Sequence, residues 1–101
     1  ALAIDSGTFT TIHSITTTTA DFEEVYIWLS NINTTQEIVT LTFGGSSDVN
    51  KVIVKVPAES TVLAVPGWTF QGASGPNTIT GASTTANKVN VHGYINLIDA
   101  A

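Results

Sequence analysis

The sequence predicts an all-β fold, an antiparallel β-sandwich of about eight strands that is jelly-roll-like in arrangement. Apolar and polar residues alternate in segment after segment, as at residues 89–96 (VNVHGYIN), and this period of two is typical of half-buried strands. Clusters of Gly, Pro, Asn and Ser separate these segments at intervals of about 8–12 residues. No segment shows the period of an amphipathic helix. The pattern does not fix the strand order, so a jelly roll, an immunoglobulin-like sandwich and a small barrel all stay open.

Each element follows from these signals in chain order. Residues 1–7 are expected to form an N-terminal arm or edge segment, and residues 8–101 a single sandwich domain. The predicted strands span 8–16, 22–30, 37–43, 51–56, 61–65, a segment that starts at 68, 78–80 and 88–98. Pro66 and Gly67 are expected to end the strand before them, and Gly81 is expected to open a loop.

The second predicted strand carries large apolar groups on both of its faces. Val25, Ile27 and Leu29 share one face because side chains alternate along a strand. Tyr26 and Trp28 share the other face. We therefore expect one face to pack on the core of this domain and the other to pack against a neighbouring chain.

Composition limits the partners that the surface can bind. Charged residues make up 11% of the chain and hydrophobic residues 43%, whereas about 25% charged residues is usual. The net charge is −5, and Lys51, Lys55 and Lys88 form no basic patch in the sequence. Because nucleic acids and anionic membranes need clustered cations, neither is an expected partner. A Thr-rich surface of low charge density suits close contact with another protein.

The residues that usually carry chemistry form no recognisable site. His13 and His92 accompany several Ser and Asp residues, but no Gly-x-Ser-x-Gly elbow is present, and both histidines are interpreted as surface or interface residues. Glu23 and Glu24 are adjacent and should point to opposite faces of a strand, which does not suit paired-carboxylate catalysis. We therefore predict no catalytic residues, no cofactor and no metal ion.

Three stretches together resemble a known group of proteins. They are 25–31 (VYIWLSN) followed by Thr34 and Thr35, 52–61 (VIVKVPAEST) and 88–95 (KVNVHGYI). Between about residues 22 and 98 the chain resembles the small β-sandwich virion proteins of tailed bacteriophages, most of all the capsid decoration, or cement, proteins. This resemblance implies a non-enzymatic protein on the exterior of the capsid. It also implies that the partners are the major capsid protein and further copies of the chain, as a homotrimer.

The interface candidates lie on two of the predicted strands. Tyr26 and Trp28 are expected on the exposed face of one strand, and His92, Tyr94 and Asn96 on the last strand. The alternative hypothesis is a carbohydrate- or receptor-binding sandwich of a tail or fibre, in which Tyr26, Trp28, Trp68 and Tyr94 form a platform for sugar rings.

Overall fold

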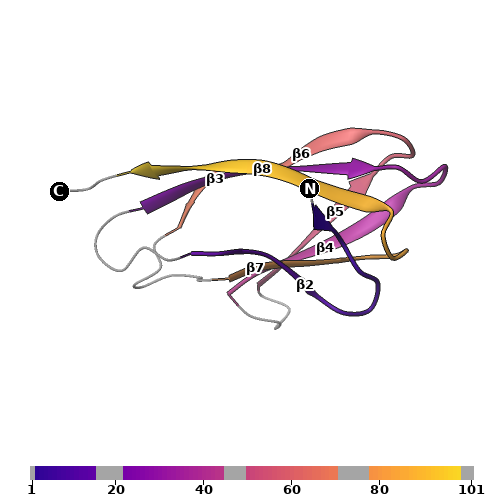
Figure 1. Cartoon of the computed structure of the whole chain (residues 1–101), viewed down its shortest axis with the longest axis horizontal. Helices are drawn as coiled ribbons and strands as arrows, with labels where there is room; N and C mark the ends of the chain where they lie inside the picture. Colours follow the sequence, from indigo (N-terminus) through magenta and orange to yellow (C-terminus); the bar gives the residue numbers. More distant parts are fainter. Residues whose placement is uncertain (1, 16–21, 45–49, 71–77, 99–101) are drawn as a thin grey trace.

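The computed structural model describes residues 2–15, 22–44, 50–70 and 78–98, which form two antiparallel sheets packed face to face (Figure 1). The strands are β1 (Leu2–Ala3), β2 (Thr10–Ser14), β3 (Phe22–Asn31), β4 (Glu37–Phe43), β5 (Lys51–Val56), β6 (Thr61–Phe70), β7 (Thr78–Ser83) and β8 (Val89–Ile98). Sheet A has the order β1-β8-β3-β6, and sheet B has the order β2-β7-β4-β5. The described residues contain no α-helix, so the predicted antiparallel β-sandwich is confirmed.

The strand order distinguishes between the jelly roll, the immunoglobulin-like sandwich and the small barrel that the sequence left open. β1 pairs with β8, β2 with β7, β3 with β6 and β4 with β5, all antiparallel. Strands at equal distances from the two ends of the chain thus lie side by side, and the pairs alternate between the two sheets. This nested pairing is that of an eight-stranded jelly roll.

The core fills the space between the sheets with β-branched and Leu side chains. Val25, Ile27 and Leu29 of β3 are all at most 3% exposed and face Val39 and Leu41 of β4, which are fully buried. Their spacing of two residues is the alternation visible in the sequence. Large-to-small changes at such positions remove both buried apolar surface and packing.

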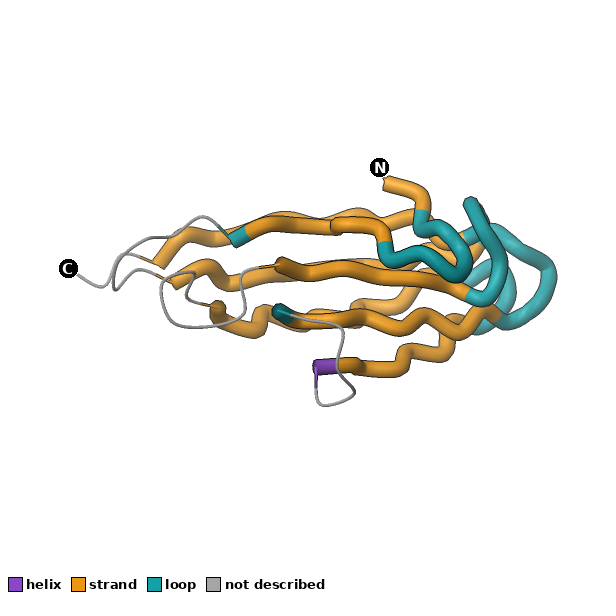
Figure 2. Tube along the Cα trace, turned by 90° about the horizontal axis from the view of Figure 1, so that it is seen from below, coloured by secondary structure: helices purple, strands orange, loops and turns teal. Residues whose placement is uncertain are grey.

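Most of the described loops gather at one end of the sandwich (Figure 2). Polar side chains tie these loops together. The Asn31 amide donates to the carbonyl oxygens of Thr35, Val56 and Pro57, and its own oxygen accepts from the N–H of Asn33. This network joins the loop after β3 to the end of β5 and gives partners to three backbone carbonyls and one backbone N–H.

Two strands continue past the residues that were predicted to end them, and β2 is shorter than the predicted strand 8–16. β6 runs without interruption through Pro66 and Gly67 to Phe70. It can do so because it is an edge strand, where a missing N–H is tolerated, and because its pairing with β3 shifts register at Gly67 and again at Ala64. β7 likewise continues through Gly81 to Ser83, since Gly81 is buried in the sheet.

The N-terminal segment contributes a short edge strand. Leu2 lies opposite Val91 of β8, and Ile4, which follows the strand, is fully buried in the core. Within the described residues no helix is of a length and hydropathy that would cross a membrane.

Candidate binding face on sheet A

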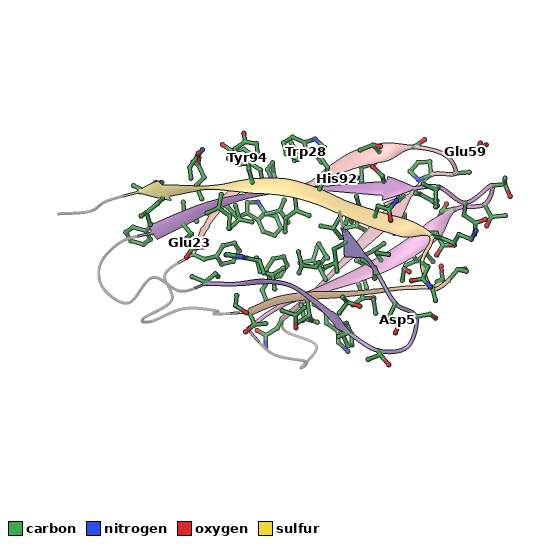
Figure 3. The ribbon with its side chains drawn as sticks, in the orientation of Figure 1. Asp5, Glu23, Trp28, Glu59, His92 and Tyr94 are labelled. Atoms are coloured by element: carbon green, nitrogen blue, oxygen red, sulfur yellow. The ribbon has the colours of Figure 1, made fainter. Side chains whose placement is uncertain are left out.

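The predicted interface residues lie together on the outer side of sheet A (Figure 3). β3 and β8 pair antiparallel without a register shift, which sets Tyr26 opposite Tyr94 and Trp28 opposite His92. Because side chains alternate, the even-numbered residues of both strands point away from the core. We call this surface the aromatic face; it comprises Glu24, Tyr26, Trp28, His92, Tyr94 and Asn96.

Three rings form a stack at the centre of the aromatic face. The ring centroids of Tyr26 and Tyr94 are 4.7 Å apart and their planes are inclined by 19°. Trp28 lies 6.4 Å from Tyr26 and 5.8 Å from Tyr94. Each Tyr ring therefore covers one face of the other, and Tyr94 remains 52% exposed. Stacking of this kind fixes the rotamers of the rings before any partner binds.

One carboxylate organises the polar edge of the aromatic face. Glu24 Oε1 accepts hydrogen bonds from the Tyr26 hydroxyl and from Asn96 Nδ2, both at 3.1 Å. The hydrogen bond to Glu24 raises the pKa of Tyr26 above its usual value of 10.0, and partial desolvation and the nearby negative charge add to the effect. Tyr26 is therefore a neutral hydroxyl at physiological pH, and Glu24 supplies the formal negative charge of the face.

β6 completes this surface by lying close under the Tyr26 ring. Gly67 has a φ of 82°, and a Cβ atom at this position would come within 2.8 Å of the Tyr26 hydroxyl oxygen. Only glycine suits both the left-handed backbone and this close approach. Further along β6, Leu63 lies opposite Trp28 and is 43% exposed, so it extends the apolar surface beside the rings.

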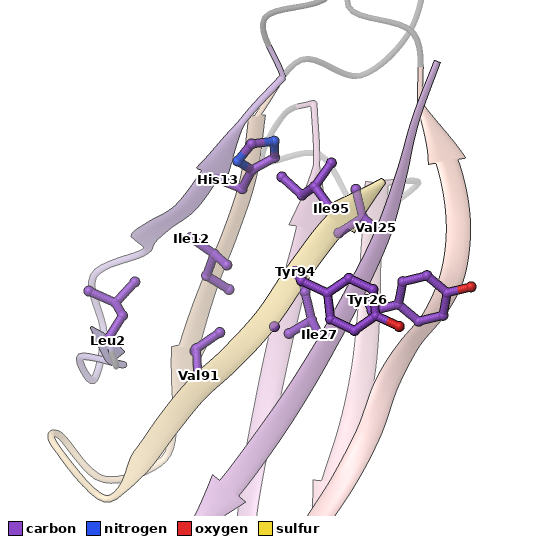
Figure 4. A pocket seen from close by; sticks show the side chains of 10 residues that line it. Leu2, Ile12, His13, Val25, Tyr26, Ile27, Val91, Tyr94 and Ile95 are labelled. Atoms are coloured by element: carbon purple, nitrogen blue, oxygen red, sulfur yellow. The ribbon is translucent and has the colours of Figure 1, made fainter. Parts of the chain in front are cut away.

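A cavity of about 260 Å³ opens beside β8, and Tyr26 and Tyr94 are among the residues that line it (Figure 4). Its lining is mostly apolar and includes Ile12, Val91 and Ile95. His13 also lines it, but no Ser, Thr or Cys is among the described residues that do so. Among the described lining residues, His13 is therefore not accompanied by a Ser or Thr hydroxyl or a Cys thiol, the usual nucleophiles of acyl transfer.

His13 is held by a carboxylate from the other sheet. Its Nε2 atom lies 2.6 Å from Glu23 Oε1, and the side chains are 26% and 7% exposed. The pair joins β2 of sheet B to β3 of sheet A, so His13 has a structural role between the sheets, which corrects the surface position that the sequence suggested. Glu23 thus points inward and Glu24 outward, as the alternation predicts.

The sequence grouped one aromatic residue wrongly and missed two other members of the surface. Trp68 lies against Phe43, with ring centroids 5.4 Å apart, and is not part of the three-ring stack. The predicted platform of four aromatics is therefore wrong. Glu24 is two residues before Tyr26, so alternation alone could have assigned it to the same face. Leu63 could not be found in this way, because the register shifts of β6 change which residue faces Trp28.

Comparisons with known proteins add no relative: no protein-family model, curated protein or solved structure matches the chain. Jelly rolls occur in viral capsid proteins and in lectins alike, and a fold alone does not determine a function. The aromatic face is therefore the feature from which a function is best inferred.

Proposed function

We propose that the chain is a non-enzymatic structural protein of a tailed-phage particle, a capsid decoration protein that binds the outside of the head and stabilises contacts between capsomers. It would do so through the aromatic face, with the major capsid protein as its partner and with further copies arranged as a homotrimer on the shell. The observation that carries this proposal is the ordered, nearly uncharged stack of Tyr26, Trp28 and Tyr94 on an exposed sheet.

The composition of the aromatic face suits contact with a protein. Trp and Tyr are the residues that most often dominate the binding energy of protein interfaces. The central residues carry no formal charge apart from Glu24, whose carboxylate already accepts two hydrogen bonds within the chain. Burying this surface therefore desolvates little charge, and the rings lose little conformational freedom since they are already stacked.

Assembly in many copies suits a small domain of this kind. An icosahedral head presents the same site many times, so contacts that are modest for one copy combine across a trimer with several anchoring points. The net charge of −5, with only three cationic residues, also suits a position outside the shell and away from packaged DNA.

The second candidate function is binding of a carbohydrate by the same rings, favoured by the 52% exposure of Tyr94 and by the polar groups of Glu24 and Asn96 beside it. A sugar ring binds by lying on the open face of an aromatic ring. Tyr26 and Tyr94 instead each cover one face of the other, with planes only 19° apart. The geometry therefore favours a protein partner that packs across the edges of the stack.

The experiment measures co-sedimentation of the purified chain with DNA-filled heads of the phage whose genome encodes it. Trp28→Ala should weaken binding at least about tenfold, or about 1.4 kcal/mol, as expected for a central aromatic contact. The matched control is Ile53→Ala, which removes an apolar side chain that is 57% exposed on sheet B. This control should bind like the wild-type chain.

Two results would overturn the proposal. One is equal binding of wild type and Trp28→Ala to the heads while both remain folded by circular dichroism. The other is absence of binding to heads together with a selective signal on a glycan array that Trp28→Ala removes, which would assign the face to a carbohydrate.

A further inference from the structure

Among the residues that the structure describes, none pairs with the outer edge of the terminal half of β8. β8 pairs with β3 along its whole length, but on its other side β1 pairs only with Val91 and Asn90. From His92 to Ile98 every residue is exposed, and Leu97 is 65% exposed although it points to the inner side of the sheet. Apolar side chains thus border this edge on both sides of the sheet, from Tyr94 to Ile98.

The backbone of this edge is ready to accept another strand. The carbonyl oxygen of Val89 accepts from Ile4, next to β1, whereas the carbonyl of Lys88 accepts from Ile32, which follows β3. Because the direction alternates along an antiparallel strand without bulges, the N–H and C=O groups of Gly93, Ile95 and Leu97 point to the free side.

The other three sheet edges carry features that oppose strand pairing. β6 contains Pro66 and two register shifts, and β2 is a five-residue strand with a register shift after Thr11. β5 carries Lys51 and Lys55. Proline, bulges and lysines are the usual means by which proteins protect edge strands. β8 has none of these features between Val89 and Ile98, and no charged residue.

We propose that the free edge of β8 pairs antiparallel with the same edge of a second copy of this chain, around a twofold axis centred on Asn96. The backbone directions require odd-numbered residues to pair with odd-numbered ones, so the axis must pass through a residue position. An axis at Ile95 would set the second copy's Ile98 opposite His92, beside the place that Leu2 occupies. An axis at Asn96 keeps all described residues of the second strand clear of β1.

This register brings together side chains that suit each other. On the inner side, Ile95 lies opposite Leu97 of the second copy, and the symmetry repeats this apolar pair. On the outer side, Tyr94 lies opposite the second copy's Ile98, and the two Asn96 residues face each other. Aromatic and β-branched cross-strand pairs stabilise sheets, and no like charges meet. The contact is self-complementary, as a twofold interface has to be.

The edge contact rests on the free backbone groups of β8 and does not depend on the proposed function, although Tyr94 of the aromatic face borders this edge. A twofold edge contact and a homotrimer on the shell can coexist, and together they would link trimers into a net. The edge contact by itself requires an even number of chains in solution.

A cysteine scan tests the register, since the chain contains no cysteine. In Asn96→Cys the two Cα atoms would be about 4.5 Å apart, within the range that a disulfide bridges. The matched control is His92→Cys, on the same strand and the same outer side, whose two copies would be about 26 Å apart. Mild oxidation should convert most of Asn96→Cys into a two-chain species on a non-reducing gel and leave His92→Cys a single chain.

A charge on the inner side gives the second test. Leu97→Lys should abolish the cross-link of Asn96→Cys without altering the circular dichroism spectrum, because Leu97 is mostly exposed in the single chain. Light scattering of the wild-type chain should give twice its 10.6 kDa mass, or a multiple of two chains. Equal cross-linking of both cysteine variants, cross-linking that survives Leu97→Lys, or a wild-type mass of one or three chains would overturn the proposal.

Discussion

Replacing Glu37 by glutamine tests how a buried carboxylate holds the loops at one end of the sandwich. Glu37 is 1% exposed. Its Oε1 atom accepts from the Thr84 hydroxyl at 2.9 Å and from the Thr85 N–H at 2.8 Å, and its Oε2 atom accepts from Asn33 Nδ2 at 3.0 Å. The carboxylate thus joins the loop before β4 to the loop after β7.

The expected loss follows from counting these donors. Glutamine has one acceptor oxygen, so in its best orientation the new NH₂ group faces Asn33 and one of the three hydrogen bonds is lost. Hydrogen bonds to charged groups contribute about 1.5–3 kcal/mol each, and the smaller desolvation of a neutral amide offsets part of the loss. We expect Glu37→Gln to lower the free energy of unfolding by about 2 kcal/mol, which shifts the urea midpoint by about 1 M.

The pKa of Glu37 predicts how the difference in stability between wild type and Glu37→Gln changes with pH. Burial alone would raise the pKa of Glu37, but the hydrogen bonds from Asn33, Thr84 and Thr85 outweigh it and lower the pKa below its usual value of 4.5. A lowered folded-state pKa stabilises the fold above pH 4.5, and this stabilisation is lost as pH falls through the folded-state value. The difference between wild type and Glu37→Gln should therefore be largest at pH 7 and shrink in acid.

The assay is urea unfolding followed by Trp fluorescence at pH 7 and at pH 3. Glu59→Gln, at an exposed turn, is the control and should change the free energy of unfolding by less than about 0.5 kcal/mol. A Glu37→Gln variant as stable as wild type at pH 7, or a deficit of the same size at both pH values, would refute the reasoning.

Three further predictions concern packing. Leu41→Ala should lower the free energy of unfolding by about 2–5 kcal/mol in urea titrations, since Leu41 is fully buried; a loss below about 1 kcal/mol would contradict the described core. Gly67→Ala should cost about 1–2 kcal/mol from its left-handed backbone alone and should change the near-ultraviolet dichroism of Tyr26; an unchanged spectrum would contradict the contact between them. Gly93→Ala should prevent folding, visible as loss of the far-ultraviolet strand signal, because its Cβ would lie within 2.1 Å of the Tyr26 carbonyl oxygen; a folded variant would contradict the spacing of β3 and β8.

Much of the sandwich could be predicted because one face of most strands is buried and the other is not. The bounds of β4 and β5 agree with the prediction, since alternation and turn residues coincide there. The run through Pro66 and Gly67 could not be predicted, because a proline is tolerated only at an edge and the sequence does not say which strand is an edge. The sequence predicts Gly81 as the start of a loop, but Gly81 lies inside β7, where a Cβ atom would come within 3.1 Å of the Ile12 side chain.

The candidate face was predictable in its members but not in its contacts. Alternation assigned Tyr26 and Trp28 to one side of a strand and Tyr94 to one side of another. The register that places Tyr26 opposite Tyr94 depends on the pairing of strands that are far apart in the chain. The alternation of residues within each strand does not reveal this pairing. For the same reason the pair between His13 and Glu23, which joins the two sheets, had no signal in the sequence.

The most direct test of the proposed binding role is hydroxyl-radical footprinting of the chain, free and bound to phage heads. Oxidation of Trp28 and Tyr94 should fall sharply on binding, while oxidation of Trp68, which lies outside the aromatic face and is 39% exposed, should not change. If bound chains show unchanged oxidation of Trp28 and Tyr94, or protection of Trp68 alone, the aromatic face is not the binding surface.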